Sequence, residues 1–135
     1  MTQSAAARAA IRELIVDYSL ALDAGDIDAC VRLFAADAEF VVYGRTFAGH
    51  AGIDKMFRDA PRGLHLTGAS SIDVRGDTAT ARSQVLFVRA GDLQLRPALY
   101  DDDLVRGERQ WKFRRRQCQF VTSRGLSDRP ETGSS

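Results

Sequence analysis

After Pro61 the chain alternates long strand-like segments with short turns, and few folds accommodate that order. The turns are Arg75-Gly76-Asp77, Ala90-Gly91-Asp92 and Gly107-Glu108, and the segments between them are rich in β-branched and aromatic residues. Strands are therefore predicted over residues 64–74, 78–89, 93–106 and 110–123. Turns at this spacing indicate a long antiparallel meander.

The residues before Pro61 show helical periodicity instead. Apolar side chains recur at helical spacing over residues 4–24, and Gly25 supplies the usual stop. Asp26 is a good N-cap for a second helix. The buried faces of these two helices are expected to hold Ile11, Leu14, Ile15, Tyr18, Leu22, Ile27, Cys30, Val31 and Phe34. A short strand over residues 39–43 and a third helix that ends before Pro61 follow.

Helices first and long strands afterwards predict an α+β fold. We expect a cone-shaped, strongly curved antiparallel sheet with three N-terminal helices over its mouth, and a ligand pocket at that mouth. Residues 1–124 are interpreted as one domain, because 135 residues are the size of a single domain. The composition of residues 125–135 is typical of a disordered tail.

Charge and composition limit the expected partners. The formal net charge is +1, so neither nucleic acid nor an anionic membrane is expected to attract the molecule. No apolar run is long enough to cross a membrane, and the first residues lack the apolar core of a signal peptide. Cys30 and Cys118 are predicted to be buried free thiols in a protein of the reducing cytoplasm. Two distant histidines, with no Cys or His pair at ligand spacing, predict no metal site.

Alternation within the segment 64–74 predicts two differently used faces. Its even positions are mostly apolar and indicate the core, as at Leu64 and Leu66. His65 lies among the small polar residues of the odd face, which is typical of a pocket wall.

The last strand changes parity along its length. Trp111 and Phe113 are odd, whereas Cys118 and Phe120 are even. A β-bulge within residues 114–117 is the simplest cause, and it would bend the strand as a cone-shaped sheet requires.

Four runs of sequence resemble a known family. They are AAIRELIVDYSLALDAGDIDACVRLFAADAEF, FAGHAGIDKMF, RGDTATARS and YDDDLVRGERQWKFRRR. Together, over roughly residues 8–122, they resemble the SnoaL-like branch of the nuclear transport factor 2-like superfamily. This branch and its relatives include polyketide cyclases, dehydratases, a hexachlorocyclohexane dehydrochlorinase, ketosteroid isomerases, dioxygenase small subunits and simple binding proteins. The resemblance implies proton transfer inside the cone without a cofactor.

Asp23 and His65 are the first candidates for that chemistry. Asp23 lies in the last turn of the first helix, where the helix dipole disfavours a negative charge. The resemblance implies that it pairs with His65, which would act as a general base. The alternatives are a polar turn residue for Asp23 and a hydrogen-bonded core histidine for His65. His50 is interpreted as a surface or cap residue.

Tyr18 and Asp102 are candidates to stabilise an oxyanion, again by the resemblance. Tyr18 matches a hydrogen-bond donor of the isomerases and of a dehydratase, but it lies on the apolar stripe and is equally well read as core. Asp102 matches the protonated aspartic acid of the ketosteroid isomerases, although two neighbouring acids leave the register open. Val42 stands where the isomerases have their base, so His65 would have to take that role.

One arginine of the run KFRRR is expected to point inward and position the far end of the substrate. The parity of Trp111 favours Arg115, whereas the parity of Cys118 and the dehydrochlorinase match favour Arg116, which we select. A strand divides this run between two faces, so it does not indicate a nucleic-acid site.

The function predicted is that of a cofactor-independent lyase or isomerase, of dehydratase or cyclase type, acting on a hydrophobic polycyclic or polyketide-like molecule. Phe34, Phe40, Met56, Phe57, Phe87, Cys118 and Phe120 are the expected apolar lining. One alternative is a non-catalytic binding or assembly module, since such chains pair as dimers or trimers through the sheet face. Another is the small subunit of a ring-hydroxylating dioxygenase.

Overall fold

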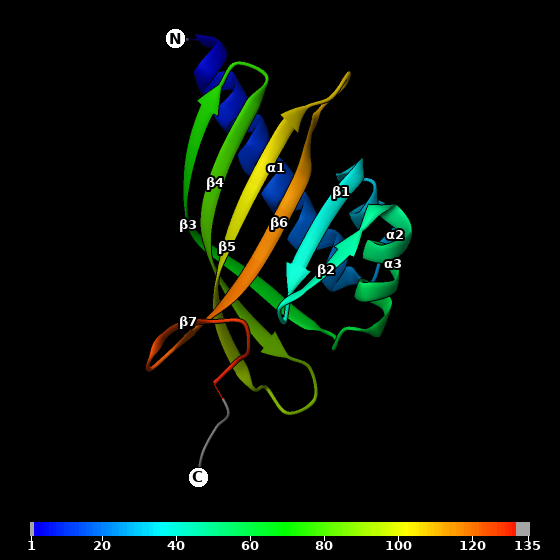
Figure 1. The fold of residues 1–135 in the computed structure, drawn as a ribbon, viewed down its shortest axis with the longest axis vertical. Helices are drawn as coiled ribbons and strands as arrows, with labels where there is room; N and C mark the ends of the chain where they lie inside the picture. The colour runs from blue at the N-terminus through cyan, green and yellow to red at the C-terminus, as the bar shows by residue number, and fades with distance from the viewer. Residues whose placement is uncertain (1, 132–135) are drawn as a thin grey trace.

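The computed structural model describes residues 2–131, with side chains from residue 4 onward. Three helices and seven strands follow one another along the chain (Figure 1). The helices are α1 (Thr2–Ala24), α2 (Ile27–Val31) and α3 (Gly49–Asp59). The strands are β1 (Phe34–Val42), β2 (Arg45–Ala48), β3 (Gly63–Arg75), β4 (Thr78–Arg89), β5 (Leu95–Arg106), β6 (Trp111–Thr122) and β7 (Gly125–Ser127). The predicted α+β fold is confirmed.

The strands form one curved, open sheet in the order β2-β1-β6-β5-β4-β3, with β7 paired to β6. The predicted antiparallel meander is confirmed for β3 to β6. The sheet as a whole is mixed, however, because β1 runs parallel to β6. About half of the chain separates β1 from β6 along the sequence, so no local turn dictates their relative direction, and the expectation of a purely antiparallel sheet was wrong.

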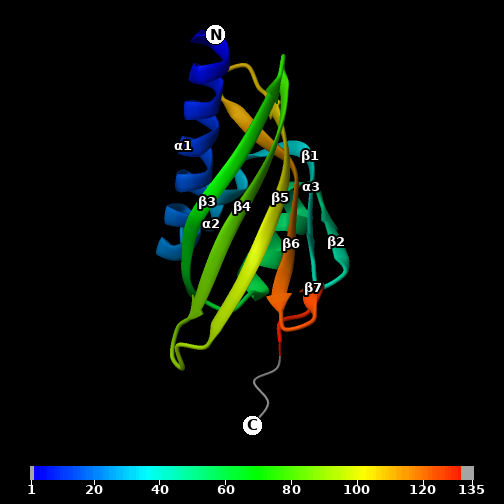
Figure 2. The same ribbon diagram turned by 90° about the vertical axis from the view of Figure 1, so that its left-hand side faces the viewer.

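Helix α1 lies along the sheet and supplies one side of the core (Figure 2). Ile11, Ile15 and Tyr18 on its inner stripe are each no more than 2% exposed. Gly25 ends the helix with a φ of +82°, a conformation that glycine adopts without steric cost. The predicted cap is confirmed, since the Asp26 side chain accepts a hydrogen bond of 3.1 Å from the backbone N–H of Ala29.

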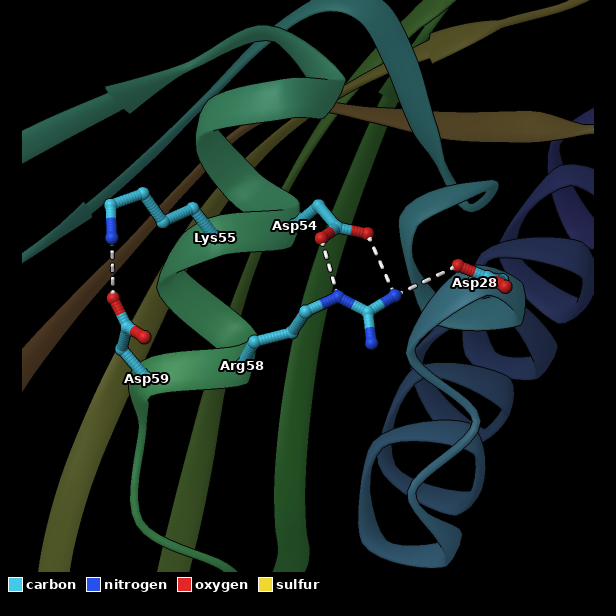
Figure 3. A network of polar contacts seen from close by, with 5 residues as sticks. All are labelled: Asp28, Asp54, Lys55, Arg58 and Asp59. Atoms are coloured by element: carbon cyan, nitrogen blue, oxygen red, sulfur yellow. Dashed lines mark hydrogen bonds and ion pairs between the residues drawn. The ribbon is translucent and has the colours of Figure 1, made fainter.

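Helix α3 covers the end of the sheet and buries Ile53 and Phe57. Arg58 ties it to α2, because its guanidinium reaches Asp54 on its own helix at 2.6 Å and Asp28 on α2 at 3.1 Å (Figure 3). At the other end of α3, His50 Nε2 lies 2.7 Å from the carbonyl oxygen of Phe34. The two short helices are thereby fixed against each other and against β1.

Two expected boundaries need correction. Phe34 begins β1 opposite Phe113 instead of ending the second helix, because that helix stops after a little more than one turn. Residues 125–127, which were predicted to belong to a disordered tail, form β7 and pair with the end of β6 through Thr122 and Gly125. Residues 132–135 lie outside the described part of the chain.

A β-bulge divides β3 into two parts with opposite inward faces. Before the bulge the odd positions face inward, contrary to the prediction that the even positions form the core. Thr67 faces Val85 and Ser70 faces Ser83, so two residues of β3 oppose one of β4 between them. His65 therefore faces inward as predicted, whereas Leu64 and Leu66 are 48% and 50% exposed on the outer face. The even positions join the core only beyond the bulge, at Ile72 and Val74.

The bulge predicted in the last strand is confirmed. Asp103 of β5 pairs with Arg115 and Leu104 with Phe113, which leaves Arg114 as the extra residue. Arg116 is consequently the inward arginine and is 0% exposed. Within residues 2–131, no helix is both long and apolar enough to cross a membrane.

Candidate active site

A cavity of about 450 Å³ opens between the end of α1, helix α3 and the curved end of the sheet. This volume suits a small organic molecule of a few rings. Its walls are largely apolar, and they include six of the seven predicted lining residues: Phe40, Met56, Phe57, Phe87, Cys118 and Phe120. Tyr18 and His65 are the candidate chemical groups that reach it.

Phe34 is the lining residue that the prediction placed wrongly. It is 1% exposed and does not line the cavity. Its ring lies under the cavity wall, with ring centroids 6.1 Å from Phe40, 6.1 Å from Phe57 and 5.1 Å from Phe113. Phe34 supports the lining and does not form it.

Asp23 and His65 form a directly hydrogen-bonded pair. The Asp23 carboxylate uses both oxygens: Oδ1 lies 2.7 Å from Nδ1 of the His65 ring, and Oδ2 accepts the backbone N–H of His65 at 2.8 Å. Two hydrogen bonds to a carboxylate outweigh the unfavourable helix dipole at the end of α1. An ionised Asp23 assigns the ring proton to Nδ1, which leaves Nε2 as the basic nitrogen. Asp23 is therefore paired with His65 and is not a polar turn residue that points to solvent.

The environment of His65 keeps its ring neutral at neutral pH. Burial lowers the pKa of His65 below its ordinary value, although the hydrogen bond and charge of Asp23 act in the opposite direction. Its side chain is 12% exposed and its ring centroid lies 4.7 Å from that of Phe87. A neutral, oriented imidazole at the wall of an apolar cavity is suited to accept a proton from carbon.

Tyr18 lies beside this pair on the cavity floor. Its ring is 6.3 Å from the His65 ring in an edge-on arrangement, although Tyr18 and Asp23 occupy different faces of α1. Burial raises the pKa of Tyr18 well above its ordinary value, so the hydroxyl remains a neutral donor. His65 on β3 contacts both Asp23 and Tyr18, and it thereby joins these two residues of α1 in one site.

Asp102 and Arg116 lie behind the floor and do not line the cavity. They are cross-strand partners, and Asp102 Oδ2 lies 2.6 Å from Arg116 Nη1 with both side chains 0% exposed. The Arg116 guanidinium stacks 4.4 Å from the ring centres of both Tyr18 and Tyr100. The expected contact of Asp102 and Arg116 with substrate is therefore corrected to support of the tyrosines, since the rings stand between them and the cavity.

Tyr100 and Arg96 line the cavity as well, and sequence reasoning did not select them. Both lie on β5 at even positions, the same parity as Asp102, and burial raises the pKa of Tyr100 above its ordinary value. Extending that parity along the strand would have identified both. Across the described part of the chain, no three His, Cys, Asp or Glu side chains gather where they can hold a metal ion.

The open curved sheet, the helix along it and the cavity at its end define a class of protein: the nuclear transport factor 2-like proteins with a cystatin-like fold. One solved member of this class, from Novosphingobium aromaticivorans, superposes with a TM-score of 0.82 at 27% identity, covering 90% of this chain and 86% of its own. Within that class the chain belongs to the SnoaL-like domain family, whose family model matches residues 3–117. The resemblance drawn from the sequence is thus confirmed.

Two other similar proteins extend the comparison. The uncharacterized protein Rv2910c of Mycobacterium tuberculosis is 34% identical over 122 residues, which cover 81% of this chain and 82% of that protein. A second Novosphingobium aromaticivorans structure, provisionally called an aromatic ring hydroxylase, is 30% identical with a TM-score of 0.76 and covers 90% of this chain and 92% of its own.

Proposed function

We propose that this protein is a lyase or isomerase that works by proton transfer, without a cofactor, on a hydrophobic polycyclic or polyketide-like small molecule. The observation that carries the proposal is the 2.7 Å contact between Asp23 Oδ1 and His65 Nδ1 at the wall of an apolar cavity. A non-catalytic binding module has no need of an oriented, neutral imidazole, and a wide separation of these two groups would have favoured that alternative.

In the proposed reaction His65 Nε2 removes a proton from a carbon α or γ to a carbonyl group. The electron pair of the broken C–H bond moves onto the carbonyl oxygen and forms an enolate. Asp23 stabilises the imidazolium that results, and the Tyr18 hydroxyl donates a hydrogen bond to the enolate oxygen. In a dehydration the imidazolium then returns its proton to the leaving hydroxyl group, which departs as water. In an isomerisation it returns the proton to another carbon.

Proton abstraction can be tested before the natural substrate is known. Purified protein is incubated in D₂O with α-tetralone and its β-hydroxy derivatives, and deuterium uptake and loss of water are followed by mass spectrometry. We expect exchange that His65→Ala abolishes and Asp23→Asn strongly reduces. His50→Gln is the matched control, since His50 hydrogen-bonds the Phe34 carbonyl away from the cavity. Wild-type exchange rates in both dyad variants would overturn the proposal.

A further inference from the structure

Cationic side chains dominate the charged part of the cavity lining. Arg45, Lys55, Arg62 and Arg96 line it, and Asp59 is the one acid among the lining residues. Lys55 is already paired with Asp59 at 2.9 Å (Figure 3). Within the described residues the three arginines take part in no ion pair. An apolar cavity with unpaired cations suits an apolar molecule that carries an anionic group.

Arg96 lies in the same cross-strand row as His65. His65 on β3 pairs with Phe87 on β4, and Phe87 pairs with Arg96 on β5. Partners in neighbouring antiparallel strands point to the same face, and all three residues line the cavity. Two strand spacings separate His65 from Arg96, which is about 10 Å across the ring of Phe87.

A hydrogen bond to Tyr43 and partial burial distinguish Arg96 from an ordinary solvated arginine. Its Nη1 donates a hydrogen bond of 3.0 Å to the hydroxyl of Tyr43, whose ring packs 5.4 Å from that of Phe120. Tyr43 occupies the hairpin turn between β1 and β2 with a φ of +56°, which a tyrosine rarely adopts. Arg96 is half-buried, and its Nε is buried without an acceptor. A buried charged donor without an acceptor is destabilising, and a nearby anion offsets that cost.

Arg45 and Arg62 occupy the outer part of the mouth. The Arg62 guanidinium lies directly over Gly25, where even a Cβ atom would stand 2.9 Å from Nη2. Arg45 lies over the Phe47 ring at 5.2 Å. Both are exposed, so solvent and salt screen them, and their field acts on the approach of an anion more than on its final binding.

We propose that the ligand of this cavity is an apolar molecule bearing a carboxylate, which Arg96 binds while the apolar body lies over Phe87. Guanidinium groups match carboxylates in geometry and charge, and Tyr43 preorganises this one. Given the proposed function, the carboxylate lies about 10 Å from the carbon that loses its proton to His65. The carboxylate site itself stands on Arg96, Tyr43 and the cavity, whether or not the dyad is catalytic.

The experiment compares two fluorescent probes of equal size, pyrenebutyrate and the neutral pyrenebutanol, by fluorescence anisotropy. We expect the wild-type protein to bind the carboxylate more tightly than the alcohol. Arg96→Gln should raise the Kd for pyrenebutyrate by about tenfold, as loss of a charge-assisted hydrogen bond predicts. The Kd for pyrenebutanol should stay unchanged. Tyr43→Phe keeps the charge and removes the hydroxyl that holds it, so we expect an intermediate loss.

Arg75→Gln is the control for net charge, because Arg75 is exposed at the turn between β3 and β4 and pairs with Asp73. It should keep the carboxylate preference. Equal binding of the two probes by the wild type, or an equal loss of both in Arg96→Gln, would overturn the proposal. Because binding is read without turnover, His65→Ala should retain the preference, so a failure of the dyad chemistry and a failure of the carboxylate site give different results.

Discussion

Asp102 and Arg116 face each other across β5 and β6 and form a fully buried ion pair, 2.6 Å between Oδ2 and Nη1. Three aromatic rings surround the guanidinium, with ring centres 4.4 Å away for Tyr18 and Tyr100 and 4.7 Å for Phe113. Burial raises the pKa of Asp102 to about 6 although Arg116 opposes the change. Because that pKa still lies below 7, the Asp102 carboxyl and Arg116 form an ionised pair at neutral pH. The pair supports the two tyrosines of the cavity floor.

Breaking this pair on one side is expected to be costly. In Asp102→Asn the buried charge of Arg116 loses its counter-charge, and the free energy of unfolding should fall by about 3 kcal/mol. The double variant Asp102→Leu with Arg116→Met leaves no buried charge and should recover much of that loss. Urea unfolding followed by circular dichroism measures both. A double variant less stable than Asp102→Asn would contradict this account of the core.

Removing the hydroxyl of Tyr18 tests its role separately from the fold. Tyr18 is 1% exposed, so Tyr18→Phe keeps the ring that stacks on Arg116 and removes only the donor. We expect deuterium exchange into a reactive ketone to slow by about 10²-fold to 10³-fold, the usual cost of losing an oxyanion donor. Unchanged near-ultraviolet circular dichroism is the control for packing. An unaltered exchange rate would assign Tyr18 to the core alone.

Gly63 should tolerate no side chain. A Cβ atom there would lie 2.6 Å from Cε1 of Phe87 and closer still to the backbone oxygen of Val88, which cannot move without opening the β3–β4 pairing. Gly63→Ala should lower the free energy of unfolding by about 1–3 kcal/mol. In the control Gly52→Ala the new Cβ meets Phe47 at an ordinary 3.5 Å, and helix propensity favours alanine. The Tm should therefore fall in Gly63→Ala and rise in Gly52→Ala. A higher Tm in Gly63→Ala would contradict the close approach of Gly63 to Val88 and Phe87.

Local sequence rules predicted the features that depend on neighbouring residues. The end of α1, the Asp26 cap and the turns between β3 and β6 follow from glycine, capping and alternation. Arg116 was selected on the parity of Cys118 and on the match to the dehydrochlorinase. The extra residue Arg114 explains why the parity of Trp111 favoured Arg115 instead. The same rules missed the bulge in β3, since Gly68 and Ala69 have no large apolar side chain whose parity would reveal it.

Features that depend on distant segments were not predictable in this way. The parallel pairing of β1 with β6 joins residues far apart in the chain, and no local pattern encodes the partner of an edge hairpin. Asp102 and Arg116 were correctly placed inward, but whether they reach the cavity depends on the Tyr18 and Tyr100 rings that cover them. Arg96 gained its significance only from its row with Phe87 and His65.

The pairing of His65 with Asp23 predicts how the histidine titrates. The chain has two histidines, so two ring resonances are expected in proton NMR spectra, and His50→Gln assigns them. Burial lowers the pKa of His65, whereas Asp23 raises it through its hydrogen bond and its charge. The wild-type ring should therefore titrate below the ordinary value of about 6.5, and in Asp23→Asn lower still. An increase in Asp23→Asn would contradict an ionised carboxylate at this contact.

The same pKa shift links His65 to stability, with a definite sign. A histidine whose pKa is lower in the folded state binds protons more tightly when the chain unfolds, so its contribution to stability is present above pH 6.5 or so and is lost as the pH falls. The difference in unfolding free energy between wild type and His65→Gln should accordingly shrink from pH 7.5 towards pH 5, and the comparison cancels the titration of Asp102, which both proteins share. Urea unfolding across that interval measures it. A difference that grows on acidification would mean that the folded protein holds His65 as the imidazolium, and the neutral base required for proton abstraction would then be absent at neutral pH.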